Sequence, residues 1–385
     1  MNCRIWPLLP LLALSTAGAL TVQVRWSVPE PRLVQGQVQR PTEHHTLTVR
    51  LPPDLPGRAP AARAAALRGA GATLAARVSR APQDIRFQPA AGGWVGAART
   101  GWTVTPAAAQ AALSAAVTRT GRVNGPVTVT LPVALTAPVR SVRWAAGQRL
   151  THLGGGESNF NGSPDFRVHN IRVGAARLHG QWTAPGGTLD FNALTGPVSA
   201  ARGFRPGYVL AGGSLRLEDG GGICQVSTTL FRAALRAGLP IPERHAHSVQ
   251  VAYYGQPGLD AAVYAGSKNL RVRNDTGAPL LVQFRWDTRA GTLRADLFGR
   301  NDGRTVRVEG APMSRVQMAP GPAFVRAPDL ARGETRRIDM PAPGGVTLIT
   351  RTVTRPGQAT RTDRFRSEYR PWGGVIAVPP GDPRG

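Results

Sequence analysis

Cysteine is nearly missing from this chain. Only two cysteines occur among 385 residues, and one of them, Cys3, lies in an amino-terminal segment that we expect to be removed. A mature chain with one thiol cannot form an intramolecular disulfide, so its stability has to come from packed apolar cores. The length suffices for roughly two or three domains of ordinary size. The remaining thiol, Cys224, is therefore expected to be either buried or reactive.

Long apolar runs are scarce as well. The amino-terminal run IWPLLPLLALSTAGAL is interrupted by Pro7 and Pro10 and is shorter than the roughly 20 apolar residues that a spanning helix needs. It contains the tripeptide AGA at residues 17–19, which has the small-x-small form of a signal-peptidase site. We therefore expect residues 1–19 to be a signal peptide that exports the chain to the cell envelope, periplasm or extracellular space. The alternative is an uncleaved signal anchor, which would be the protein's only contact with a membrane.

Lysine is represented by Lys268 alone, although lysine and arginine together number 47 against 22 acidic residues and give a formal charge of +25. The arginines are dispersed along the chain and form no basic tail or helix of the kind that binds nucleic acid, so we expect no nucleic-acid partner. They reflect either a compositional bias on solvated surfaces or an attraction to polyanions. Outside the cytoplasm the second reading points to anionic cell-wall polymers.

Apolar periodicity predicts a multi-domain α+β protein. Residues 20–147 form a small α+β domain, because strand-like alternation surrounds two alanine-rich helical patterns at residues 61–78 and 107–117. Residues 148–300 form a domain of mixed helices and antiparallel sheet. Residues 301–385 form a β-rich tail of short strands separated by proline and glycine.

The middle domain carries two predicted helices. One begins at Ser163 and Pro164, which are favourable residues for a helix cap and a first helical position. The other begins near Cys224 and ends at Gly238. An antiparallel meander is expected to follow, with strands at residues 248–254, 261–265, 270–274, 280–286 and 292–299.

Cys224 is the candidate nucleophile because it follows a glycine run at the start of a helix. The first amides of a helix lack internal partners and concentrate positive potential, so a thiol there ionises more readily. The same amides can hold the oxyanion of a tetrahedral intermediate. Glycines 220–222 would let an extended peptide approach the sulfur. The alternative is that Cys224 is a small core residue.

Two histidines follow closely. If residues 243–251 are extended, His245 and His247 point to the same face, and one could take the thiol proton while the other orients it or binds substrate. We favour His247 as the base. A zinc site built from Cys224 and both histidines, completed by a carboxylate of Glu243 or Asp260, is a weaker alternative because no CxxC or HExxH spacing supports it. No metal or organic cofactor is expected.

Several polar residues near the thiol have two readings. Gln225, Ser227 and Thr228 lie in the first helical turn, where they either cap the helix or bind a substrate amide. Arg244 and Arg172 could bind carboxylates of a peptide substrate, although exposed arginines usually have no specific role.

Residues 154–299 resemble a VanW domain, a family named for an accessory protein of glycopeptide-resistance clusters. The resemblance rests on FNGSPDFRVHNIRVGA, APGGTLDFNALTGP, GGGICQVSTTLFRAALRAGLPIPERHAHS, GLDAAVYAG and LRVRNDTGAPLLV. Some proteins with this domain are L,D-transpeptidases of peptidoglycan, and their catalytic cysteine would correspond to Cys224. The candidate substrate and oxyanion residues are Gly221, Gly222, Gln225, Ser227, Arg244, Asp260 and Asn170.

The flanking regions carry further resemblances. Residues 45–145 are similar to the peptidoglycan-binding domain that often precedes a VanW domain, and the tail from Gly333 resembles wall-associated modules of the G-five type. Together these features predict an exported L,D-transpeptidase that forms a thioester at Cys224 and has peptidoglycan as its partner. A cysteine peptidase that hydrolyses stem peptides and a non-catalytic wall-binding scaffold are the two alternatives.

Overall fold

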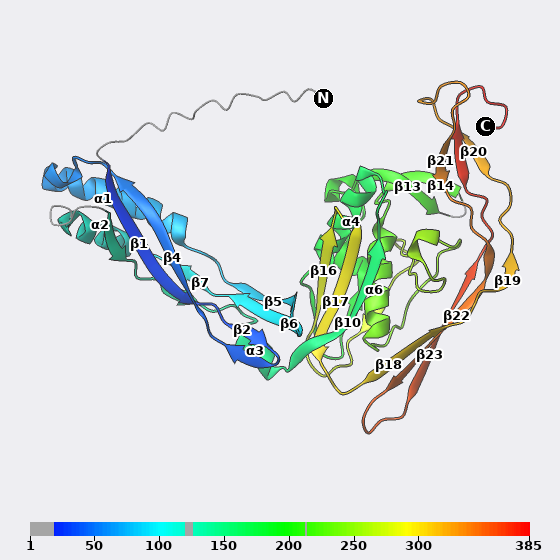
Figure 1. Cartoon of the computed structure of the whole chain (residues 1–385), viewed down its shortest axis with the longest axis horizontal. Helices are drawn as coiled ribbons and strands as arrows, with labels where there is room; N and C mark the ends of the chain where they lie inside the picture. Colours follow the sequence, from blue (N-terminus) through cyan, green and yellow to red (C-terminus); the bar gives the residue numbers. More distant parts are fainter. Residues whose placement is uncertain (1–18, 120–125, 212–213) are drawn as a thin grey trace, which may run out of the picture. The chain divides into compact units, whose positions relative to one another are not determined.

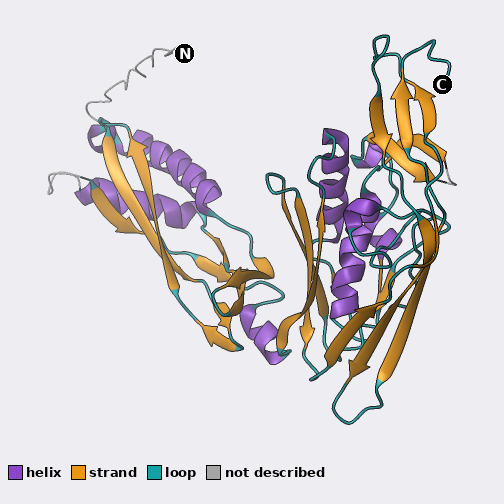
Figure 2. Ribbon diagram, turned by 45° about the vertical axis from the view of Figure 1, so that its right-hand side comes forward, coloured by secondary structure: helices purple, strands orange, loops and turns teal. Residues whose placement is uncertain are grey.

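The computed structural model describes residues 19–119, 126–211 and 214–385. The predicted signal peptide, apart from its last residue, lies outside the described residues. The chain forms two compact units, Met1–Ala146 and Gly147–Gly385. Within the described part of the chain, no helix is both long and apolar enough to cross a bilayer. Figure 1 traces the elements in sequence order, and Figure 2 separates helices from strands.

The first unit packs two helices against a three-stranded sheet. Strand β1 (Leu20–Pro29) lies at the centre, antiparallel to β4 (Thr42–Leu51) and parallel to β8 (Val127–Thr130). The alanine-rich helices α1 (Pro60–Val78) and α2 (Pro106–Arg119) cover the sheet. Both helices were predicted from their periodicity and are confirmed. Their leucines and valines join Val22 and Val24 in one buried core.

Smaller elements complete this unit. A second sheet has the order β3-β2-β6-β5, and a short pair joins β7 to β9. Their bounds are β2 (Arg32–Val34), β3 (Gln37–Gln39), β5 (Gln83–Ala90), β6 (Gly93–Arg99), β7 (Gly101–Thr103) and β9 (Ala134–Thr136), with the helices η1 (Leu55–Gly57) and α3 (Val142–Gly147).

The second unit is built around helix α6 (Ile223–Arg236), which packs on strands β10 (Leu150–Asn159) and β17 (Thr292–Arg300). These strands belong to a sheet of order β10-β17-β16-β11. Two glycines allow the helix to lie against β10: a Cβ at Gly154 would come within 2.6 Å of the Ala237 nitrogen, and one at Gly156 within 2.1 Å of the Thr229 oxygen. The sequence GGG in β10 is therefore a packing feature of the helix that carries Cys224.

Further helices and strands surround this core. Their bounds are α4 (Asp165–Leu178), α5 (Phe191–Thr195), η2 (Ala200–Arg202), η3 (Ala252–Tyr254), β11 (Trp182–Thr183), β12 (Thr188–Asp190), β13 (Pro206–Ala211), β14 (Ser214–Asp219), β15 (Arg271–Arg273) and β16 (Leu280–Asp287). Helix α4 packs on α6. It begins at Asp165 with Pro164 at the N-cap and no side-chain cap, so the predicted cap by Ser163 is wrong; the Ser163 hydroxyl accepts a hydrogen bond from Arg167 Nε instead.

The tail is all β and belongs to the same compact unit as the middle domain. One sheet has the order β18-β22-β19 with β23 also paired to β22, and a second has the order β20-β24-β21. Their bounds are β18 (Thr305–Gly310), β19 (Ser314–Gln317), β20 (Ala323–Arg326), β21 (Arg336–Asp339), β22 (Gly344–Thr354), β23 (Arg361–Tyr369) and β24 (Val375–Val378). The prediction of a multi-domain α+β protein with a β-rich tail is thus confirmed.

The predicted meander after α6 is wrong in its first half. Residues 248–254 contain the 3₁₀ helix η3, and residues 243–263 contribute only isolated bridges. Strand β15 pairs with β12, so only β16 and β17 form the expected hairpin. The reason is that side chains replace strand partners here: the Ala261 amide donates to Thr228 Oγ1 and the His247 amide to Asp260 Oδ2.

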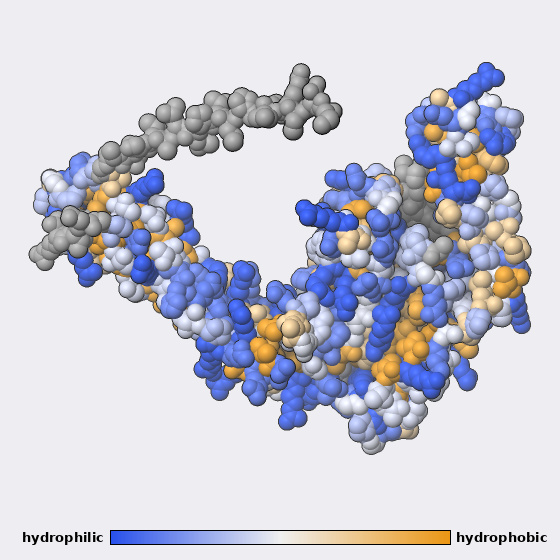
Figure 3. Space-filling view, in the orientation of Figure 1, coloured by the Kyte–Doolittle hydropathy of each residue, from blue (hydrophilic) through white to orange (hydrophobic). Residues whose placement is uncertain are grey.

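Polar residues cover most of the surface seen in Figure 3, in keeping with the high net charge. Exposed large apolar side chains occur in both units: Val139 of the first unit and Val316, Met318 and Met340 of the tail are each more than half exposed.

Candidate active site

A tight glycine turn leads into helix α6. Gly220 and Gly222 have φ angles of 87° and 113°, in the left-handed region that favours glycine. A Cβ at Gly222 would also lie 3.1 Å from Arg167 Cγ and from Ile171 Cγ1. The turn therefore requires glycine for its backbone and for its packing against α4, and it places Cys224 in the first turn of the helix as predicted.

Cys224 is the free cysteine of the described residues and is partly buried. Its Sγ lies 3.4 Å from the Val263 carbonyl oxygen and 3.5 Å from the Val263 amide nitrogen, so the irregular segment after the histidines forms one wall of the site. Burial acts to raise the pKa of the thiol, but the hydrogen bond and charge of His247, the Val263 amide and the Arg167 guanidinium together lower it below its ordinary value. The surroundings thus favour the thiolate.

His247 joins Cys224 to a buried carboxylate. Its Nδ1 donates to Asp260 Oδ2 at 2.6 Å, and its backbone amide donates to the same oxygen at 2.8 Å. Because Nδ1 is engaged, Nε2 is the nitrogen left for the thiol. Burial acts to lower the pKa of His247, yet its hydrogen bonds to Asp260 and Cys224 raise the pKa to about 9. The two shifts together favour a thiolate at Cys224 beside an imidazolium at His247.

Asp260 is held by three side chains and is itself almost fully buried. Its Oδ1 accepts from Arg244 Nη2 at 3.0 Å and from the Tyr369 hydroxyl at 2.6 Å. Burial acts to raise the pKa of Asp260, but His247, Arg244 and Tyr369 lower it well below its usual range. Asp260, which the sequence offered as a substrate or zinc-binding residue, thus lies where it orients the histidine.

Sequence reasoning missed Arg167. This residue lies in the first turn of α4, where its Nη2 donates to Gln225 Oε1 at 2.7 Å and its Nε to Ser163 Oγ at 3.2 Å. Its guanidinium lies 5.0 Å from the ring centroid of Tyr253. A signal was present, since Arg167 precedes Ile171 by four residues and so puts a charge on the apolar face of the helix.

Two tyrosines border the site on the side of η3. Tyr254 is buried and its ring lies 5.6 Å from that of His247, whereas Tyr253 is 56% exposed. Burial raises the pKa of the Tyr254 hydroxyl, so this group remains a neutral hydrogen-bonding group.

Three predicted residues use their side chains for internal contacts. Gln225 donates to Ser158 Oγ and to the Asn159 carbonyl, and Ser227 donates to the Ala261 carbonyl at 2.6 Å. Asn170 bonds both the amide and the carbonyl of Arg205 and also reaches the Gly221 carbonyl at 3.2 Å. All three are fully buried, so their side chains hold the backbone around Cys224 in place rather than contact a substrate.

The remaining candidates lie apart from the thiol. His245 Nε2 bonds Glu243 Oε1 at 3.0 Å, and Arg172 is exposed on α4. Arg244 is only 4% exposed and is bound to Asp260. No cluster of three or more histidine, cysteine, aspartate or glutamate side chains suited to a metal ion occurs in residues 19–119, 126–211 and 214–385. Two of the proposed zinc ligands, His245 and His247, are instead bonded to separate carboxylates.

The contribution of Arg167 can be measured directly. Arg167→Met removes a positive charge near the sulfur, and we expect the thiol pKa to rise by roughly half a pH unit because His247 and the Val263 amide act more strongly. The measurement is the pH dependence of Cys224 alkylation by iodoacetamide. Arg172→Met, an exposed residue of the same helix, is the control. Equal profiles for the two variants would contradict a role for Arg167.

Comparisons with known proteins find one family and two curated relatives. Residues 166–298 match the family model described as VanW like protein. Uncharacterized protein YoaR of Bacillus subtilis (strain 168) is 34% identical over 160 residues, which cover 42% of this chain and 52% of that protein. Vancomycin B-type resistance protein VanW of Enterococcus faecalis (strain ATCC 700802 / V583) is 34% identical over 116 residues, covering 29% of this chain and 42% of that protein. No solved structure matches the chain.

These matches cover only part of the chain and part of each relative. The chain spans about half the length of these curated relatives or less. The family model does not reach the peptidoglycan-binding and G-five resemblances at either side, which stay predictions. It does include Cys224, His247 and Asp260. Residues 166–298 therefore form a VanW-like domain.

Proposed function

We propose that this protein is an exported cysteine acyltransferase that cross-links peptidoglycan stem peptides as an L,D-transpeptidase. The observation that carries the proposal is the hydrogen-bonded series from Cys224 through His247 to Asp260 at the start of α6. A nucleophile, a base and a group that orients the base are the parts that acyl transfer through a covalent intermediate needs.

The first half-reaction breaks an amide. The Cys224 thiolate attacks the carbonyl carbon of the donor stem, forming a C–S bond and an oxyanion. The intermediate collapses as the C–N bond breaks, and the His247 imidazolium gives its Nε2 proton to the leaving amine of the terminal D-amino acid. A thioester at Cys224 and a neutral His247 remain.

The second half-reaction restores the enzyme. The side-chain amine of a neighbouring stem attacks the thioester carbonyl and transfers a proton to His247. The C–S bond breaks, a new amide joins the two stems, and the thiolate–imidazolium pair forms again. Asp260 stays ionised throughout and stabilises the charged ring.

Backbone amides stabilise the oxyanion. The amides of Ile223 and Gln225 are engaged with the carbonyls of Gly220 and Gly222, so the amides of Cys224 and Gly222 are the donors we assign. Asn170 binds the Gly221 carbonyl. Because the peptide unit is planar and trans, this contact turns the Gly222 amide to the opposite side and fixes its direction.

The comparisons support the choice of the cell wall. One relative carries the name vancomycin B-type resistance protein. The sequence motif around Cys224, which resembles that of the transpeptidase cysteine, supports the acyl-transfer chemistry. The dispersed arginines suit a protein that works beside anionic wall polymers.

The test is incubation of the purified protein with tetrapeptide-bearing muropeptides, followed by mass spectrometry. We expect cross-linked dimers and released D-amino acid from the wild type and neither from Cys224→Ala. Shortened monomers without dimers would show that water is the acceptor and would make the protein a peptidase. Unchanged muropeptides in both samples would contradict catalysis on stem peptides.

A further inference from the structure

The tail reaches the candidate active site through Tyr369. This residue ends β23 and is only 4% exposed. Its hydroxyl donates to Asp260 Oδ1 at 2.6 Å and accepts the Gly258 amide hydrogen at 2.8 Å. Burial and the nearby Asp260 charge raise the pKa of Tyr369, so the hydroxyl keeps its proton and remains a donor. A residue beyond the matched VanW-like segment thus contacts the carboxylate that orients His247.

A second contact from the same strand holds the other partner of Asp260. Arg244 Nη1 donates to Ser367 Oγ at 2.8 Å, while its Nη2 donates to Asp260 Oδ1. Arg244 Nε also donates to the Asp260 backbone carbonyl at 2.6 Å. Both donors to Oδ1 are therefore fixed by β23, which leaves Oδ2 facing His247.

The sheet that contains β23 is attached to the carboxyl end of α6, the end opposite Cys224. Arg351 of β22 is fully buried and donates to the carbonyls of Ala234 and Leu235 at 3.2 Å. Arg304 and Arg361 both donate to the Gly238 carbonyl. These arginines satisfy carbonyls at the negative end of α6 and complement its dipole.

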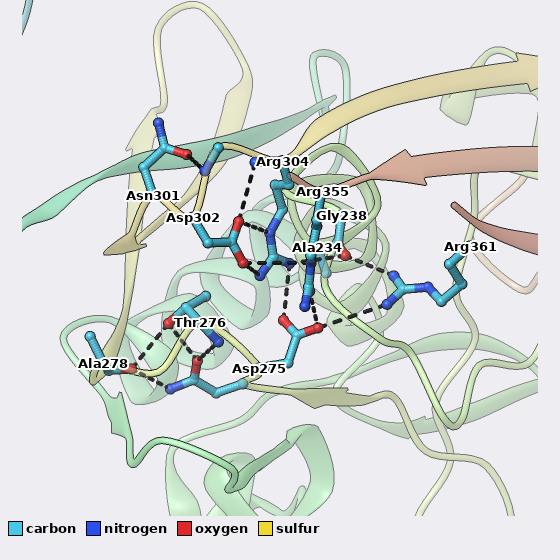
Figure 4. Close-up of polar contacts among 12 residues, drawn as sticks. Ala234, Gly238, Asp275, Thr276, Ala278, Asn301, Asp302, Arg304, Arg355 and Arg361 are labelled. Atoms are coloured by element: carbon cyan, nitrogen blue, oxygen red, sulfur yellow. Dashed lines mark hydrogen bonds and ion pairs between the residues drawn. The ribbon is translucent and has the colours of Figure 1, made fainter. Parts of the chain in front are cut away.

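Acidic residues complete this anchor. Arg351 is paired with Asp363 at 2.7 Å, and Arg304 with Asp302 at 2.6 Å and Asp275 at 2.9 Å. Figure 4 shows Arg304, Arg355 and Arg361 gathered around Asp275 and Asp302. The tail is therefore attached to the carboxyl end of α6 by hydrogen bonds to its carbonyls and to Asp275 by ion pairs. This attachment holds the sheet whose strand β23 reaches Asp260.

We propose that Tyr369 is a positioning residue of the active site, which makes the β-rich tail part of the catalytic unit. With Arg244 and Ser367 it holds the Asp260 carboxylate so that Oδ2 bonds His247 Nδ1, and it thereby maintains the thiolate at Cys224. The inference rests on the proposed role of Cys224 as a thiolate nucleophile. It assigns the tail a function other than wall binding.

The test is the pH dependence of Cys224 alkylation by iodoacetamide in the full chain. Tyr369→Phe removes one of the two donors to Oδ1. We expect the carboxylate to turn toward Arg244 and the Oδ2–Nδ1 bond to lengthen, so that the imidazolium is less stabilised and the thiol pKa rises by roughly half to one pH unit. The low-field proton resonance of His247 Nδ1–H should shift or broaden in the same variant.

Two further variants make the test specific. Tyr264→Phe removes the hydroxyl of a half-exposed tyrosine that contacts Glu218 and not Asp260, so its profile should match the wild type. Ser367→Ala removes one of the several hydrogen bonds of Arg244 and a hydrogen bond to Tyr369, and leaves both donors to Oδ1 in place. It should give a smaller shift in the direction of Tyr369→Phe, which provides a readout if the larger change impairs folding.

Each result has one meaning. A Tyr369→Phe profile equal to that of the wild type, an equal shift in Tyr264→Phe, or a shift to lower pH would overturn the positioning role. A downward shift would mean that the hydroxyl only weakens the charge of Asp260. If the wild-type thiol itself titrates like an ordinary cysteine, the proposed nucleophile is at fault instead.

Discussion

Replacing His247 with glutamine is expected to lower the rate of stem-peptide transfer by about 10³-fold, because general acid–base catalysis commonly contributes 10² to 10⁴. Glutamine cannot carry the proton to the leaving amine. It also removes the positive charge and hydrogen bond that lower the thiol pKa, so alkylation of Cys224 at neutral pH should slow as well. Muropeptide turnover and alkylation rates measure the two effects separately.

His245→Gln is the matched control for this change. His245 bonds Glu243 and has no described contact with Cys224, so its replacement should leave turnover close to that of the wild type. Equal losses in the two variants would contradict the assignment of His247 as the base.

Replacing Asp260 with asparagine is expected to lower turnover by up to about 10⁴-fold and to destabilise the second unit. The neutral amide no longer stabilises the imidazolium, so the His247 pKa should fall from about 9 and the thiol pKa should rise. Arg244, at 4% exposure, loses its ionic partner, and removing one member of a buried pair typically costs about 3–5 kcal/mol. The measurements are turnover, the alkylation profile and the unfolding temperature.

Asp190→Asn serves as the comparison. Asp190 pairs with Arg271, whose side chain is 50% exposed, and exposed pairs typically contribute at most about 1 kcal/mol. A similar loss of stability in both variants, or an unchanged alkylation profile in Asp260→Asn, would contradict the account of Asp260.

The ion pair also predicts how stability depends on pH. His247 has a folded pKa of about 9, above its ordinary value of 6.5. A raised pKa means that the folded state binds the proton more tightly, so the contribution of His247 is fully present below pH 6.5 and is lost as the pH rises through about 9. Catalysis should be lost in the same alkaline range, because the proton for the leaving group is then absent.

The sequence predicted the parts of the site that depend on local pattern. Cys224 and its helix followed from the glycine run, the apolar periodicity and the stop at Gly238. His247 was favoured over His245, and the structure directs these two rings to different carboxylates. The expected extended strand that would place both rings on one face is not formed.

Contacts between residues that are far apart in the sequence could not be predicted from local sequence patterns. Asp260 was recognised as a candidate, but its role became evident only from its contacts with His247 and Arg244. Tyr369 is 109 positions from Asp260, and a tyrosine in an alternating strand looks like an ordinary packing residue. The strand prediction for residues 243–263 was wrong because buried side chains, rather than a neighbouring strand, accept hydrogen bonds from backbone amides of this segment.

The most direct test of the account is the pH dependence of Cys224 alkylation in the wild-type protein. If Cys224 and His247 form an activated pair, alkylation should remain fast well below the ordinary cysteine pKa of about 8.5. In His247→Gln the fall in alkylation rate on acidification should occur at higher pH. A thiol that reacts only above pH 8.5 or so, with the same profile in both proteins, would contradict the pairing of Cys224 with His247.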